Sequence, residues 1–160
     1  MKNILIPTDF TVDSLELLKI AIQNEPEERI RVTLVYGASL SNSICDLLFF
    51  SKSACLDKLR EPNFCEALSI IQNKYSKKIH RIDTELFMSH STAAFHNFLE
   101  GNAIDKVYVP LRDDILKVDK SKGFNLVPYL KKSNLETQEI DYRQAANINE
   151  GQQLSRLLIR

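Results

Sequence analysis

Ile4-Leu5-Ile6-Pro7-Thr8-Asp9-Phe10, close to the start of the chain, supports the fold prediction most strongly. Its apolar part is short and ends at a proline, which is typical of a strand buried on both faces of a parallel sheet. A helical stripe of apolar residues follows and runs to about residue 24. A buried strand followed at once by an amphipathic helix indicates the first unit of an α/β domain.

The rest of the chain repeats this order. Further strands are predicted at residues 30–36, 79–88, 106–109 and 136–142. Helical patterns are found at residues 41–60, 64–76 and 91–100, and a last helix is predicted to open at Gly123. Because parallel strands need crossover connections, we predict an α/β fold with a doubly wound, five-stranded parallel sheet and helices on both faces, of the Rossmann-like class. Residues 1–142 form the predicted domain, and residues 143–160 form a polar tail with a short amphipathic end.

The composition of the chain indicates which classes of binding partner and which cellular compartment to expect. The 160 residues fit one domain, and 21 basic residues balance 21 acidic ones, so we expect neither nucleic acid nor a membrane as partner. The cysteines at positions 45, 55 and 65 have no close CxxC spacing, which argues against a disulfide framework or a metal site. The first apolar run is too short for a signal peptide or a membrane span, and we predict a cytoplasmic protein.

Two segments of the chain resemble one known family. The stretch from Ile4 to Phe10 is similar to the first strand of universal stress proteins, often written VPTDFS or VPVDGS. The stretch from Asn102 to Val109 resembles the approach to that family's fourth strand, which reads roughly GADLIVMG. The resemblance covers about residues 1–142, and it implies the universal stress protein fold, which is adenine nucleotide alpha hydrolase-like, and a role in stress response.

The resemblance also points to a loop that has lost its ligand-binding residues. ATP-binding members of the family carry G-x2-G-x9-G-[ST] after the fourth strand, and here the glycine positions fall on Pro110, Asp113 and Gly123, with Phe124 in place of the hydroxyl. Pro110 has no N–H to donate to phosphate, and Phe124 has no hydroxyl. The charge of Asp113 would oppose a polyphosphate by about 4 kcal/mol per charge pair at about 4 Å. We therefore predict a degenerate nucleotide site that does not bind ATP, and no cofactor.

Four residues remain as candidate ligand contacts. By resemblance, Asp9, Tyr36 and Gly123 belong to a remnant nucleotide pocket, and His90 follows the third strand, where it could contact a ligand or titrate near neutral pH. Asp9 could instead cap a loop or helix, and Tyr36 could fill the space of a base rather than stack on one. For His90, an ordinary surface histidine is the more common interpretation.

The sequence contains no HxGH, SGGxDS, GxSxG, P-loop, HExxH or GxGxxG motif, so we predict that the protein is not an enzyme. The function we expect is that of a non-enzymatic regulatory or scaffold protein in stress response. The resemblance implies a homodimer that pairs through the last strand, residues 136–142, and a possible protein partner. The alternative is a sensor of a small ligand or nucleotide, with a reshaped pocket at the ends of the first, second and fourth strands.

Overall fold

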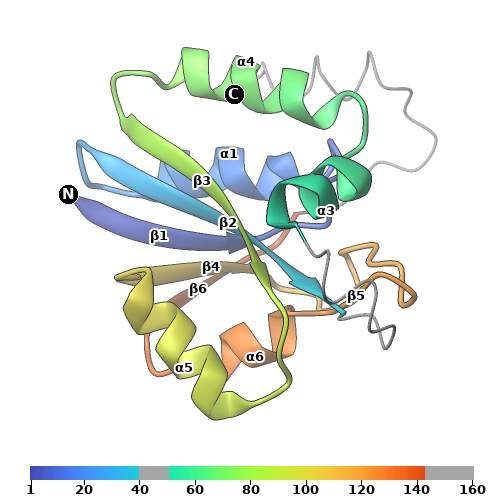
Figure 1. Cartoon of the computed structure of the whole chain (residues 1–160). Coiled ribbons are helices and arrows are strands. Elements are labelled where there is room, and N and C mark those ends of the chain that lie inside the picture. Colours follow the sequence, from blue (N-terminus) through green and yellow to red (C-terminus); the bar gives the residue numbers. More distant parts are fainter. Residues whose placement is uncertain (40–50, 143–160) are drawn as a thin grey trace.

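The computed structural model describes residues 1–39 and 51–142 and contains a central parallel sheet (Figure 1). Its five main strands lie in the order β3-β2-β1-β4-β6, and each pairs in parallel with its neighbours. Their bounds are β1 (Lys2–Pro7), β2 (Ile30–Ala38), β3 (Ile79–Phe87), β4 (Lys106–Pro110) and β6 (Glu136–Ile140). The predicted doubly wound, five-stranded parallel sheet is therefore confirmed.

Helices cover both faces of this sheet (Figure 1). One face packs against α1 (Leu15–Asn24), α3 (Lys52–Leu59) and α4 (Phe64–Lys74), and the other against α5 (Thr92–Gly101) and α6 (Val127–Lys131). Alternate residues of a strand point to opposite faces, so Ile4 and Ile6 join the α1 side of the core while Leu5 joins the α5 side. Burial on both faces explains why β1 is apolar at successive positions.

The direction of winding reverses between β1 and β4. From β1 the chain adds β2 and β3 on one side, and then it crosses back to add β4 and β6 on the other side. In open sheets of this kind, ligands bind beyond the carboxyl ends of the strands at such a reversal. The loops after β1, β2 and β4 therefore frame the candidate site.

The prediction that Gly123 opens a helix is wrong. Gly123 and Phe124 form a short strand, β5 (Gly123–Phe124), which pairs antiparallel with the end of β2. The helix that follows, α6, begins at Val127 and has its proline in the first turn. Because β2 runs to Ala38, beyond the residues predicted for it, its last residues offer hydrogen-bonding groups to this distant segment.

Some predictions fall outside the described residues. They include the tail at residues 143–160 and the first part of the helix predicted for residues 41–60, whose later part is α3. Within the described part of the chain, no helix is both long enough and apolar enough to cross a membrane.

Candidate functional site

Asp9 lies in the loop after β1 and is almost completely buried. Its Oδ1 accepts hydrogen bonds from the backbone N–H of Thr11 at 3.1 Å and from the Thr11 hydroxyl at 2.6 Å. Its Oδ2 accepts one from the backbone N–H of Lys117 at 2.8 Å. Both carboxylate oxygens are thus engaged by the protein, and they fasten the loop after β1 to the segment that follows β4.

Phe10 and Tyr36 fill the space beside Asp9. Their rings stack with centroids 5.1 Å apart, and Phe64 packs edge-on against Phe10 at 5.4 Å. Phe10 has a φ of 61°, a left-handed conformation that is uncommon for a bulky residue, and its backbone carbonyl accepts a hydrogen bond from the N–H of Glu61 at 3.2 Å. Burial raises the pKa of Tyr36 to about 12, and the charges of Asp119 and Asp9 add to the effect.

Gly123 permits a close approach between β5 and the end of β2. A Cβ atom at this position would lie 2.6 Å from the Tyr36 hydroxyl oxygen and even nearer to the carbonyl oxygen of Gly37. No other residue fits there without displacing the backbone. One more hydrogen bond joins the residues next to this strand pair: the N–H of Ser39, just after β2, donates to the carbonyl of Lys122, just before β5, at 3.0 Å.

The segment between β4 and β5, residues 111–122, is attached at several points along its length. The N–H of Leu111 donates to the carbonyl of Ile140 at 2.8 Å, and Leu116 is buried in the core. Asp113 forms an ion pair with Lys131 of α6, with 2.6 Å between Oδ1 and Nζ. Leu116, with Ile115 and Val118 partly buried beside it, packs this segment against the α5 side of the core.

His90 lies apart from the other three candidates. Its exposed ring packs on Phe124 with 4.5 Å between centroids, and its Nδ1 is 3.2 Å from the hydroxyl of Tyr129. Phe124 packs into the core on the α5 and α6 side, whereas Phe10 and Tyr36 belong to the core on the α1 side. The structure therefore brings Asp9, Tyr36 and Gly123 together but places His90 on the other face of the sheet.

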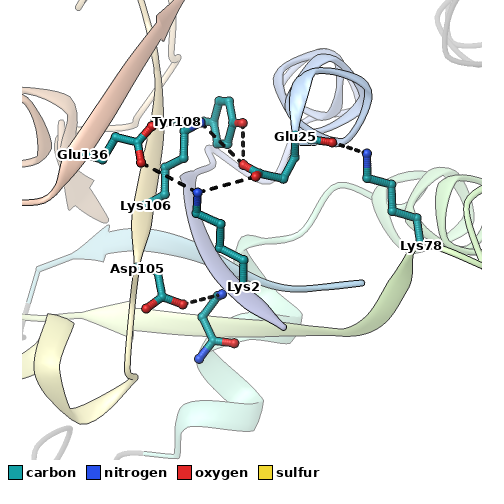
Figure 2. Close-up of polar contacts among 8 residues, drawn as sticks. Lys2, Glu25, Lys78, Asp105, Lys106, Tyr108 and Glu136 are labelled. Atoms are coloured by element: carbon teal, nitrogen blue, oxygen red, sulfur yellow. Dashed lines mark hydrogen bonds and ion pairs between the residues drawn. The ribbon is translucent and has the colours of Figure 1, made fainter. Parts of the chain in front are cut away.

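A second polar cluster, which the sequence analysis missed, lies at the amino end of the sheet (Figure 2). Its centre is Glu25, which ends α1 in an extended conformation, as expected for a residue that precedes proline. The side chain of Glu25 is fully buried. Its Oε2 accepts a hydrogen bond from the Tyr108 hydroxyl at 2.7 Å and lies 3.5 Å from the Lys106 Nζ, while its Oε1 lies 3.5 Å from the Lys2 Nζ.

The same two lysines also meet Glu136, the first residue of β6. The distances from its carboxylate are 3.3 Å to the Lys106 Nζ and 3.7 Å to the Lys2 Nζ. Burial alone would raise the pKa of Glu25, but the Tyr108 hydrogen bond and the charges of Lys106 and Lys2 outweigh it and hold this pKa below its ordinary value. Burial and the Glu25 carboxylate in turn raise the pKa of Tyr108.

One signal in the sequence pointed to this cluster. Lys2 and Lys106 each stand at the first position of a buried strand, and β1 and β4 are neighbours in the sheet. Two lysines at the starts of neighbouring buried strands need a counter-charge. In the described residues, no group of three or more His, Cys, Asp or Glu side chains could hold a metal ion.

Comparison with known proteins gives a match in structure. No protein-family model and no curated protein sequence matches the chain. A universal stress protein family member from Burkholderia pseudomallei superposes with a TM-score of 0.51 and 11% identity, over 88% of this chain and 96% of the other. The chain has the universal stress protein fold.

Two further structures agree with this result. The universal stress protein from Archaeoglobus fulgidus superposes with a TM-score of 0.52 and 12% identity, over 88% of this chain and 94% of that protein. A universal stress protein in complex with cAMP superposes with a TM-score of 0.52 and 11% identity, over 87% of this chain and 96% of that protein. The resemblance found in the sequence is thus confirmed for the fold, at identities that indicate strong divergence.

Proposed function

We propose that this protein is a non-enzymatic regulatory or scaffold protein in stress response, which acts in the cytoplasm as a homodimer and does not bind ATP. The universal stress protein fold supports the general role. The observation that carries the proposal is the filling of the candidate site by the chain itself. Both oxygens of Asp9 are hydrogen-bonded within the protein, and the stacked rings of Phe10 and Tyr36 lie beside it.

The segment after β4 supports the absence of ATP binding. A phosphate loop needs backbone N–H groups that face an open space. Pro110 has no N–H to offer, and the side chain of Leu116, further along this segment, is buried in the core. A nucleotide bound here would displace Leu116 and break the hydrogen bond between Lys117 and Asp9. Losing a hydrogen bond to a buried carboxylate costs about 1–3 kcal/mol of free energy. Exposing the Leu116 side chain to water would increase this cost.

Thermal stability in the presence of nucleotides tests this part of the proposal. A ligand at 100 times its dissociation constant adds about 2.7 kcal/mol, which raises the Tm of a protein of this size by several degrees. We expect no shift of the Tm with millimolar Mg-ATP, AMP or adenosine. A clear shift with Mg-ATP would contradict the proposal, and a shift with AMP or adenosine alone would favour the sensor described below.

The position of β6 supports the homodimer. This strand pairs with β4 and is the last strand in the sheet order, so it is an edge that a second copy can extend. We expect a dimer in light scattering and its weakening by Gln138→Lys, which brings two like charges together where paired copies meet. Gln72→Lys, on the exposed face of α4, is the matched control. Equal dimerisation of the two variants would exclude β6 as the interface.

A small-ligand sensor is the second candidate function. It is favoured by the convergence of Asp9, Tyr36 and Gly123 at the switch point and by the cAMP bound to one protein of the same fold. A ligand would bind after residues 111–122 move away from Asp9. Here cAMP should raise the Tm of the wild type, and Asp9→Asn should reduce that rise. An equal rise in both proteins would remove Asp9 from the site.

A further inference from the structure

We infer that Glu25 is a positioning residue that clamps the edge strand β6 to the sheet through Lys2 and Lys106. Figure 2 shows the arrangement, in which the two lysines lie between Glu25 and Glu136. Among the described residues, Glu25 forms no hydrogen bond or ion pair with β6 itself. Its effect on that strand therefore passes through the two ammonium groups.

The location of Glu25 is unfavourable for a carboxylate on its own. The side chain is fully buried, and it stands at the carboxyl end of α1, where the helix dipole is negative. Neither feature stabilises α1, because a basic side chain, not an acidic one, stabilises the carboxyl end of a helix. The Tyr108 hydroxyl and the two lysines offset the cost of burying the Glu25 carboxylate. The buried position of Glu25 is therefore explained by its contacts in the cluster and not by any stabilisation of α1.

The two lysines depend on Glu25 for their orientation. Lys106 has only 7% of its side chain exposed, and its ammonium group lies over the Tyr108 ring at 4.7 Å. Lys2 is more accessible, with 23% of its side chain exposed. Without Glu25 their remaining partner in the cluster is Glu136, which is 63% exposed and forms a weaker, solvent-screened pair. Lys106 would then be a buried charge with too little compensation, and its side chain would turn toward water.

The first residue of β6, Glu136, lies at the end of the strand that has the fewest buried contacts. At its far end, Ile140 is buried and its carbonyl accepts the Leu111 N–H, whereas the first residue, Glu136, is exposed. The strand is short and pairs with β4 alone. Local opening begins where buried contacts are fewest, so the lysine bridge governs the fraying of β6 from its start.

Amide hydrogen exchange of the full chain tests the clamp. Glu25→Gln keeps the shape and removes the charge, and we expect the β6 amides that bond to β4 to exchange about tenfold faster, with β3 amides changing much less. Glu139→Gln is the matched control, because it removes the same charge from β6 itself but breaks only the exposed pair with Lys131 at 3.8 Å. Equal effects of the two variants on β6 would overturn the inference.

A surface variant keeps the test decisive if Glu25→Gln does not fold. Glu136→Gln leaves the buried core intact and should speed exchange selectively in the first half of β6, by less than Glu25→Gln does. When both variants fold, their effects on β6 should fall short of additive in the double variant, because both act through the same lysines. Unchanged β6 exchange in Glu136→Gln, or additive effects, would contradict a clamp.

The clamp has a consequence for assembly, which rests on the proposed homodimer. If a second copy pairs along β6, Glu25→Gln should weaken the dimer at least as strongly as it loosens the strand. Light scattering of the same samples distinguishes a failure of the clamp from a failure of the proposed homodimer. Faster β6 exchange in a protein that is monomeric with or without the substitution upholds the clamp and rejects the dimer, whereas unaltered exchange rejects the clamp whatever the oligomeric state.

Discussion

The rings of Phe10 and Tyr36 stack with their planes only 17° from parallel, and they join the loop after β1 to the end of β2. Aromatic pairs of this geometry stabilise by about 0.5–1.5 kcal/mol beyond the area that they bury. That contribution helps to offset the left-handed backbone of Phe10. The stack fills the switch point with side chains at the place where related folds leave room for a ligand.

Removing the Phe10 ring should leave a cavity that accepts a flat ligand. We expect Phe10→Ala to lower the free energy of unfolding by about 3–5 kcal/mol in urea denaturation. If the ring stands where a base would lie, adenosine should then stabilise the variant but not the wild type. Phe98→Ala, at a partly buried position that packs against the core on the other face, is the control and should show no response to adenosine. A Phe10→Ala protein that ignores adenosine would show that the ring does not occupy a base position.

Asp9 should contribute to stability rather than to ligand affinity alone. Asp9→Asn replaces one acceptor oxygen by an amide that faces the N–H of Lys117 or the Thr11 donors, and we expect a loss of about 1–3 kcal/mol in the free energy of unfolding. Asp57→Asn, at an exposed position of α3, should change it by less than about 0.5 kcal/mol. Similar values for both variants would mean that the loop does not depend on Asp9.

The glycines at positions 123 and 101 should respond in opposite directions to alanine. Gly123→Ala forces a methyl group against Tyr36 and the backbone of β2, which should cost about 1–3 kcal/mol. Gly101→Ala places a methyl group in open space at the end of α5 and should stabilise by about 0.4–1 kcal/mol. Urea midpoints measure both effects, and a neutral Gly123→Ala would refute the close packing of β5 on β2.

The Glu25 cluster should make stability depend on acid pH. The folded-state pKa of Glu25 lies below its ordinary value of 4.5, so the unfolded chain binds the proton more readily. The contribution to stability is then complete above about pH 5 and is lost as pH falls through the folded pKa. Glu25→Gln should show a flatter loss of unfolding free energy between about pH 5 and 3. Parallel curves for variant and wild type would rule out this linkage.

Buried tyrosines should destabilise the fold in alkali. Burial raises the pKa of Tyr36 to about 12 and also raises those of Tyr108 and Tyr142 above their ordinary value of 10.0. The unfolded chain therefore loses these protons first, and stability falls as pH rises above about 10. Absorbance at a wavelength that reports tyrosinate should rise together with unfolding. Tyr36→Phe should lose less stability than the wild type between pH 10 and 12, and an unchanged slope would argue against a raised pKa at Tyr36.

Local patterns were sufficient to predict most of the sheet. β1 and β4 matched the predicted residues 3–7 and 106–109 closely, because strands buried on both faces are apolar without interruption and here end at prolines. The short strand at Gly123 was missed, since it exists only through pairing with β2, more than eighty residues earlier in the chain. Its two residues carry no periodic signal of their own.

The contacts of the candidate site residues were only partly predictable from the sequence. The order of strands placed Asp9, Tyr36 and Gly123 near one another, as a switch point requires. The packing of His90 on Phe124 and Tyr129 could not be predicted, because it depends on contacts between segments far apart in the chain. The occupation of Asp9 by the N–H of Lys117 depends on the path of residues 111–122, which no local pattern encodes.

Local patterns in the sequence were enough to predict most of the strands and helices in their order along the chain, because these depend on residues close together in the chain. Which charges meet depends instead on how the strands pack against one another. Glu25 before a proline is, in sequence, an ordinary acidic turn residue. It becomes the centre of a buried cluster because β1 and β4 are neighbours in the sheet and bring Lys2 and Lys106 to it. Charges in a low-dielectric interior are stable only with partners, and here the fold supplies them.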